Sequence, residues 1–310
     1  KFFYVAQLEE AIHLRKFFPS KKIKISVFEG LIHDPKYYYK YNLIPILNNF
    51  PQFQLLEKYN TTNIRSKIKA ILNFDTGMNR LGFDEKDKQL LIKNFTKFKN
   101  TEIIYLMSHL SKASLNSSKE NKKQLNKLSM IQELFNYPKL TLSNTNGILL
   151  GSRYVLDQTR PGIGIYGVDA NGKQVYVKNR ILSFPFVLKC PIIQIREVKK
   201  GSKISYNGLT KVVRDSKLAT IGIGYADGIL KLLRNRININ IKGVDCNIMG
   251  AITMDSFIID ITDLKNTPKI GDYIDLLSGD NIHKNFLHGS NLSIYEIFTL
   301  ISDRIKKNYI

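Results

Sequence analysis

The sequence predicts an α/β protein in which a parallel (β/α) barrel domain is followed by a mostly-β domain. Its 310 residues suggest two domains, since one domain averages roughly 150 residues. Residues 2–167 alternate short apolar runs with amphipathic stretches, which is typical of βα units around a parallel sheet. After about residue 182 the pattern changes to strands and glycine turns. We therefore expect domains at residues 1–182 and 183–310.

The first half contains candidate strands separated by helical segments. Residues 6–18 show apolar side chains at helix spacing, and residues 84–95 form a second such segment with Asp84 as a plausible N-cap. The strand candidates are FFYVA, IKISVFE, LIPIL, IKAILNF, EIIYLMS, LTLSN and RPGIGIYG. These are seven runs, whereas eight βα units close a barrel of this type.

The second half shows almost no helical periodicity. Its strand candidates lie in ILSFPFVLKCPIIQIREV, GSKISYNG, KLATIGIGYADG, ININIKGVDCNIMG, MDSFIIDIT and DYIDLLSG. Glycine-containing turns separate them, so we expect a compact β barrel or sandwich. A short helix around YEIFTLISDRIKK follows it.

The net charge of +21 could indicate a nucleic acid or an anionic membrane as a partner. The lysines are instead spread over almost every segment, and no stripe collects them. The segment KENKKQLNK, residues 119–127, is typical of the solvated face of a helix. We expect no nucleic-acid partner.

The two cysteines, Cys190 and Cys246, stand in no metal-ligand or disulfide spacing, so we expect reduced core thiols and no metal. No run of 18 apolar residues occurs, and the N-terminal residues lack the layout of a signal peptide. The sequence favours a cytoplasmic enzyme with no membrane partner.

Polar side chains follow several successive strand candidates. Because the loops after parallel strands converge on one mouth, these residues are expected to share an anion-binding, proton-handling pocket. They are Asp75, Thr76, Arg80, His109, Asn144 and Thr145, and Arg160, which precedes the last strand region, joins them. The alternatives are ordinary: a surface ion pair for Arg80, a half-buried structural histidine, and a helix cap at Asn144 and Thr145.

The run RPGIGIYG contains a literal G-x-G-x-x-G at Gly162, Gly164 and Gly167. A dinucleotide site requires a helix opening within the motif, and none is expected here. The glycines more plausibly let backbone N–H groups approach a phosphate. In the β half, Tyr206 and Tyr225 lie beside glycine turns, where a tyrosine near cations can act as a base, although most tyrosines are structural.

Eight segments of the chain resemble, in order, the motifs of the alanine racemase family. They are FDTGMNRLGF, SHLSKA, SNTNGILL, QTRPGIGIYG, ISYNG, GIGYADG, MGAITMDSFIIDIT and YEIFTLISDRI. The resemblance implies a fold-type III enzyme with pyridoxal 5'-phosphate, a TIM-type barrel and a β domain. It also implies alanine as substrate, D-alanine for bacterial peptidoglycan, and a head-to-tail homodimer that shares its active sites.

The resemblance also implies roles for individual residues. Arg160 is similar to the arginine that faces the pyridine nitrogen of the cofactor, and His109 to the residue stacked behind the pyridine ring. Arg80 is similar to the arginine near the cofactor's ring oxygen and the substrate carboxylate. The residues similar to the phosphate-site group are Asn144, Thr145, Gly162, Ile163 and Tyr295.

Three residues of the β half complete the implied site. Tyr206 is similar to the second base, supplied by the partner subunit, and Met254 to the partner residue whose backbone meets the substrate carboxylate. Tyr225 is similar to a residue at the entrance.

Two departures from the family pattern stand out. Asn73 occupies the position before FDTG that often carries a carbamylated lysine, and we expect it to support Arg80 by a neutral hydrogen bond or through a bound anion. The family's cofactor lysine lies in a first-strand motif like VKANAYGHG, which no segment here matches. We expect that the first βα unit is missing and that residues 1–310 alone do not racemise alanine. A non-catalytic cofactor-binding remnant and a broad-specificity racemase are the alternatives.

Overall fold

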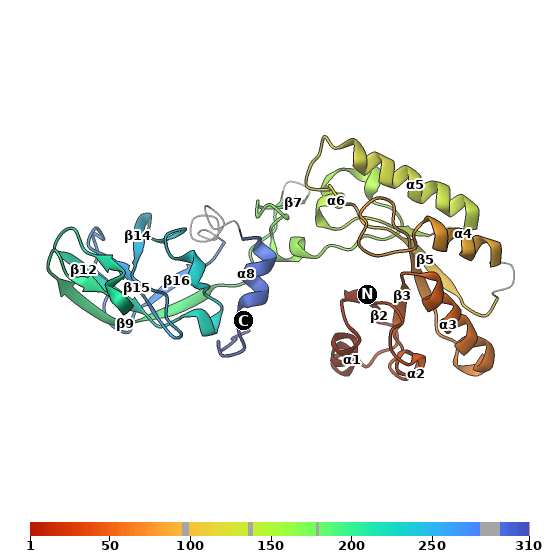
Figure 1. The fold of residues 1–310 in the computed structure, drawn as a ribbon, viewed down its shortest axis with the longest axis horizontal. Helices are drawn as coiled ribbons and strands as arrows, with labels where there is room; N and C mark the ends of the chain where they lie inside the picture. The colour runs from red at the N-terminus through yellow and green to blue at the C-terminus, as the bar shows by residue number, and fades with distance from the viewer. Residues whose placement is uncertain (95–98, 136–138, 178–179, 280–291, 310) are drawn as a thin grey trace. The chain divides into compact units, whose positions relative to one another are not determined.

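The computed structural model describes residues 1–94, 99–135, 139–177, 180–279 and 292–309 (Figure 1). The chain divides into two compact units, Lys1–Gly162 and Ile163–Ile310. This division lies before the expected domain boundary at residues 182 and 183, which stays a prediction.

Parallel strands in chain order form the sheet of the first unit. They are β1 (Phe2–Val5), β2 (Lys24–Val27), β3 (Ile44–Leu47), β4 (Ala70–Asn73), β5 (Ile103–Met107) and β6 (Leu140–Thr141). Each pairs with the next in parallel register. This unbroken order is the winding of a barrel wall, whereas a doubly wound sheet reverses its order.

Helices connect these strands. They are α1 (Leu8–Phe17), α2 (Pro35–Lys40), α3 (Phe50–Thr62), α4 (Glu85–Asn94), α5 (Lys119–Phe135) and α6 (Thr145–Leu149). Asn49 caps α3 by accepting the Gln52 N–H, and Asp84 accepts the Asp87 N–H at 2.7 Å, which confirms the predicted cap. Short 3-10 helices lie at Ile64–Ser66 and Ser152–Tyr154.

The pleat of the strands divides the first unit's core in two, because successive side chains point to opposite faces of a sheet. One cluster packs against the helices and includes Ile25, Leu72 and Leu106 from the strands and Leu56 and Leu128 from the helices. The other lies on the opposite face and consists of Ile44, Ile46, Ile71 and Met107.

The predicted strand RPGIGIYG is wrong. The chain pairs with β6 before this segment, through an isolated parallel bridge between Thr141 and Gln158. Within the segment, Ile163–Tyr166 form a 3-10 helix. Pro161 has no N–H for a ladder, and Gly167 adopts a φ of 78°, a left-handed value that does not extend a strand.

An antiparallel sheet forms the second unit. Its strands are β9 (Leu188–Val198), β12 (Ser216–Ile221), β13 (Asn238–Ile241), β14 (Val244–Met249), β15 (Phe257–Asp260) and β16 (Tyr273–Leu277), in the order β13-β14-β15-β12-β9-β16. Two small ribbons, β7 (Tyr176–Val177) with β8 (Arg180–Ile181) and β10 (Lys203–Ile204) with β11 (Thr210–Lys211), accompany it. The expected late helix is α8 (Ile294–Leu300).

Short 3-10 helices of the second unit lie at Tyr206–Gly208, Tyr225–Asp227 and Lys231–Leu233. Cys190 and Cys246 are free thiols buried in this unit, as expected. No helix of the described residues is both long enough and apolar enough to cross a membrane.

Candidate active site

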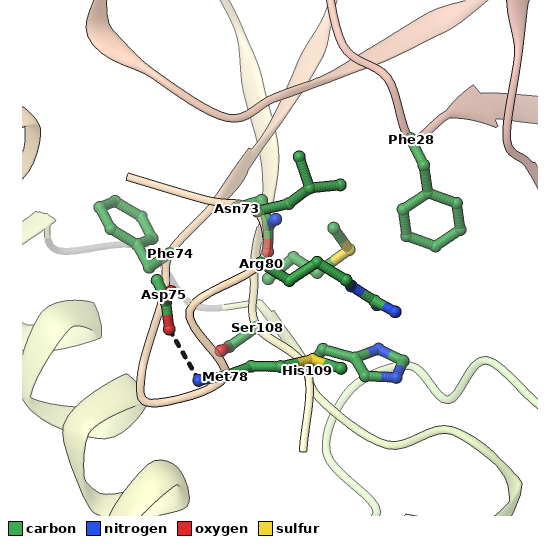
Figure 2. Close-up of a pocket in the computed structure, with 10 residues that line it drawn as sticks. Phe28, Asn73, Phe74, Asp75, Met78, Arg80, Ser108 and His109 are labelled. Carbon is green, nitrogen blue, oxygen red and sulfur yellow. Dashed lines mark hydrogen bonds between the residues drawn. The ribbon is translucent and has the colours of Figure 1, made fainter. Parts of the chain in front are cut away.

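A pocket opens at the carboxyl ends of β4 and β5 in the first unit (Figure 2). It brings Arg80 and His109 together, as the sequence predicted. Its lining residues are Phe28, Asn73, Phe74, Asp75, Met78, Arg80, Leu81, Met107, Ser108 and His109.

The loop 75–82 carries Arg80 into this pocket. The Asp75 N–H donates to the Phe83 carbonyl at 3.1 Å, and the Phe83 N–H donates to the Asn73 carbonyl at 2.7 Å, so the loop returns to the strand it left. The Asp75 carboxylate accepts the N–H groups of Gly77 and Met78, the second of which Figure 2 shows. Gly82 has a φ of 116°, and a Cβ there would lie 2.7 Å from the Asp75 nitrogen. Glycine is therefore required where the loop closes.

Arg80 is exposed at the pocket mouth, on the side where Phe28 and His109 lie in Figure 2. Among the described residues it has neither a hydrogen bond nor an ion pair. The expected hydrogen bond from Asn73 is not found, because the Asn73 amide donates to Asn48 Oδ1 at 2.8 Å. Asn48 in turn donates to the Phe28 and Ile46 carbonyls. The guanidinium is therefore free to bind an anion.

His109 follows β5 and is largely removed from solvent. Burial, together with the charges of Arg160 and Arg80, lowers the pKa of its imidazole to about 4. The ring is therefore neutral at physiological pH. Its Nε2 lies 3.4 Å from the Asn144 amide nitrogen, so the two side chains are adjacent.

Arg160 is the most buried cation of the site, with 8% of its surface exposed. Its terminal nitrogens donate to the Thr141 hydroxyl and, at 2.7 and 3.0 Å, to the Ser108 and Leu142 carbonyls. The guanidinium lies 5.9 Å from the centre of the Tyr4 ring. Burial lowers the pKa of Arg160 to about 10, which leaves it charged at neutral pH.

One nitrogen of the Arg160 guanidinium makes no hydrogen bond among the described residues. This nitrogen is Nε, and it is buried. A buried donor normally has an acceptor, so the Arg160 Nε could donate to a bound group. A neutral aromatic nitrogen would suit it.

Four of the predicted phosphate-site residues form two hydrogen-bonded pairs, one in each unit, and the fifth, Asn144, caps a helix. In the first unit, the Gly162 N–H donates to the Thr145 hydroxyl at 3.2 Å, and Asn144 caps α6 by accepting the Gly147 N–H. In the second unit, the Ile163 N–H donates to the Tyr295 hydroxyl at 3.0 Å.

Tyr206, Tyr225 and Met254 lie on exposed turns of the second unit. Tyr206 is 71% exposed, between Ser205 and Asn207, whose φ values are 62° and 59°. The N–H groups of Tyr225 and Ala226 donate to the carbonyls of Thr253 and Met254 at 3.0 and 3.1 Å. The structure thus brings Tyr225 and Met254 together.

Ser108 lines the pocket, and the Gln124 amide donates to the His109 carbonyl next to it; the sequence analysis named neither residue. Gln124 lies in α5, within the segment expected to be a solvated face, yet it and Asn121 are each 1% exposed. The prediction was wrong for these two positions. A signal was present, because Leu128, Ile131 and Phe135 form a buried stripe whose helical spacing continues back to residues 124 and 121.

Known proteins resemble the whole chain. The family model described as "Alanine racemase, N-terminal domain" matches residues 1–170, and "Alanine racemase, C-terminal domain" matches residues 186–309. An alanine racemase of Rickettsia bellii is 33% identical over 312 residues, covering 100% of this chain and 75% of that protein. A catabolic alanine racemase of Rhizobium johnstonii is 31% identical and covers 99% and 80%.

The solved structures agree. The alanine racemase of Bartonella henselae, crystallised with covalently bound pyridoxal phosphate, superposes with a TM-score of 0.87 at 33% identity. The match covers 100% of this chain and 85% of that one. The predicted fold class, a TIM-type barrel sheet followed by a β domain, is confirmed.

Proposed function

Because the chain belongs to the alanine racemase family, we propose that it interconverts L-alanine and D-alanine with pyridoxal 5'-phosphate as cofactor. The observation that carries the proposal for this chain's own residues is the buried, unpaired Nε of Arg160. It fits the pyridine nitrogen of that cofactor, an acceptor that carries no proton of its own.

When bound, pyridoxal phosphate withdraws electrons from the substrate Cα and so acidifies its proton. The residues of this chain adjust that chemistry. Arg160 would donate to the ring nitrogen and keep it unprotonated, which would limit electron withdrawal and favour racemisation over transamination. His109, neutral because of its burial, would lie beside the ring without adding charge.

The Arg80 guanidinium is a cation that donates no hydrogen bond to the described side chains. A planar guanidinium binds a carboxylate or a phenolate oxygen in two parallel hydrogen bonds, which a lysine cannot do. It would orient the substrate carboxylate and the ring oxygen of the cofactor. The hydroxyl of Thr145 and the N–H of Gly162 would bind the phosphate, with Asn144 capping the helix α6 that begins at Thr145.

The second unit would supply the remaining groups of the proposal, with Tyr206 and Met254 coming from the partner subunit of the homodimer. Tyr206 acts as a base on one face of the substrate Cα, and its exposure leaves its hydroxyl available. The N–H of Met254 would meet the substrate carboxylate, and Tyr225 would lie at the entrance. Ile163 and Tyr295 would add donors for the phosphate.

Several wider features belong to the same proposal. The protein would work as a homodimer in the bacterial cytoplasm and supply D-alanine for peptidoglycan. Residues 1–182 would form the cofactor domain and residues 183–310 the β domain.

Enantiomer-resolving chromatography of alanine tests the proposal. The purified chain is incubated with pyridoxal phosphate and L-alanine, both alone and as an extended protein, in which the family's lysine-bearing first βα unit precedes residue 1. The extended protein is expected to give equal amounts of both enantiomers. An extended protein that binds the cofactor and leaves L-alanine unchanged overturns the proposal, and serine or lysine racemised faster would indicate a broad-specificity enzyme.

A further inference from the structure

The side-chain amide of Gln124 joins two segments of the first unit that carry candidate site residues. Its Oε1 accepts the Ser111 N–H at 2.8 Å and the Ser111 hydroxyl at 3.0 Å. Its Nε2 donates to the Thr76 hydroxyl at 3.2 Å and to the His109 carbonyl at 2.9 Å. Both donors and both lone pairs of the amide are therefore used.

Each partner on the donor side leads to a group of the pocket. Thr76 lies in the loop 75–82 that carries Arg80, and its hydroxyl also contacts the Ser108 hydroxyl at 2.7 Å. The His109 carbonyl belongs to the residue whose imidazole lines the same pocket. The loop also lies on Gln124, since a Cβ at Gly77 would contact the Gln124 Cγ at 3.7 Å.

We propose that Gln124 is a positioning residue, which fixes the Arg80 loop relative to His109 and so prepares the pocket for the cofactor. This inference rests on the proposed function. Only an amide meets both requirements at this place, because a carboxylate cannot donate to the His109 carbonyl and an aliphatic side chain leaves the Thr76, Ser111 and His109 groups unsatisfied.

Asn121 offers a matched control one helical turn earlier in α5. It is equally buried, at 1% exposure, and its amide donates to the Lys112 and Leu115 carbonyls, both at 3.1 Å. It thus fixes the segment 112–115 and contacts neither Thr76 nor His109. Replacing Asn121 removes a buried amide from the same helix without releasing the Arg80 loop.

The test is the dissociation constant of pyridoxal phosphate for residues 1–310, measured by absorbance titration. Gln124→Met, of similar volume, is expected to weaken binding about 10-fold, since a misplaced binding group loses most of a charged hydrogen bond. Asn121→Leu should change the constant less than about 2-fold, although both variants lose buried amide bonds and melt at lower temperature. Thr76→Val removes the hydrogen bond between the Gln124 amide and the Thr76 hydroxyl and is expected to weaken cofactor binding about 3-fold. This variant tests the inference if Gln124→Met does not fold.

A double-mutant cycle separates positioning from general loss of structure. If Gln124 acts through Arg80, Gln124→Met should weaken cofactor binding much less in an Arg80→Met background than in the wild type. The inference is overturned if the two effects are independent, or if Gln124→Met and Asn121→Leu weaken binding equally. An extended protein that binds no pyridoxal phosphate would instead contradict the proposed function itself.

Discussion

The two units of the molecule hold their candidate groups in different ways. In the first unit, Arg160 and His109 are desolvated and surrounded by side chains and strand-end carbonyls, and the pKa of each is lowered by burial. In the second unit, Tyr206 and Met254 are 71% and 51% exposed, and turns of the backbone place them. Burial fixes position and alters proton affinity, whereas an exposed turn leaves a group accessible to a substrate.

This difference predicts which property each substitution should change. Groups of the first unit should govern the affinity for the cofactor and the stability of the fold. The exposed groups of the second unit, Tyr206 and Met254, should govern turnover. The following predictions test that separation.

Replacing Tyr206 by Phe should have the largest effect. Loss of a general base typically lowers turnover by 10²–10⁴, so the extended protein should lose about 1000-fold in kcat. Cofactor affinity and melting temperature should be unchanged, because the side chain is exposed. Tyr273→Phe, in an exposed tyrosine of β16, is the control and should leave kcat unaltered. Equal losses in both variants would contradict a role for Tyr206.

Replacing Arg160 by Met should lower the affinity for pyridoxal phosphate. The charged hydrogen bond to the cofactor is lost, and such bonds contribute about 1.5–3 kcal/mol, so the dissociation constant of pyridoxal phosphate should rise about 100-fold. Titration of residues 1–310 measures it. Arg65→Met, at an exposed arginine of the same unit, should bind as the wild type does. Unchanged affinity in Arg160→Met would remove Arg160 from the cofactor site.

Replacing Gly250 by Ala should disturb the turn that carries Tyr206. A Cβ there would lie 2.3 Å from the Ser205 Cβ, next to Tyr206. Misplaced catalytic groups cost up to about 100-fold, and we expect about 10-fold in kcat of the extended protein. Gly243→Ala is matched, since its φ of 89° is equally left-handed but nothing lies within 4 Å of a Cβ. If the two variants lose the same activity, backbone strain and not the collision is responsible.

The stability of the first unit should depend on pH through His109. Its folded pKa of about 4 lies below the unfolded value of 6.5, so the unfolded chain binds more protons between these limits and stability falls as pH decreases through them. From pH 6.5 to 5.5 this amounts to about 1 kcal/mol. Urea unfolding at both pH values measures it, with His109→Gln removing this contribution.

Carboxylates titrate in part of the same range, so the comparison between variants carries the test. His13→Gln, at an exposed histidine of α1, should keep the wild-type dependence on pH. A His109→Gln protein with the same dependence would show that His109 is not held neutral.

The order of strands and most helices could be predicted because buried parallel strands are short apolar runs between amphipathic segments. RPGIGIYG has the same composition, and only Pro161 and the left-handed Gly167 distinguish it from a strand. Arg80 and His109 could be predicted to share a pocket because they follow successive parallel strands. Gln124 could not be assigned a role, since its partners come from residues 76, 109 and 111, and only folding brings these together.

A crystal structure of the protein with pyridoxal phosphate tests the central claim most directly. The account predicts the ring nitrogen within hydrogen-bonding distance of the Arg160 Nε, with the His109 imidazole beside the ring. A cofactor bound elsewhere, with the Arg160 Nε still unpaired, would contradict it.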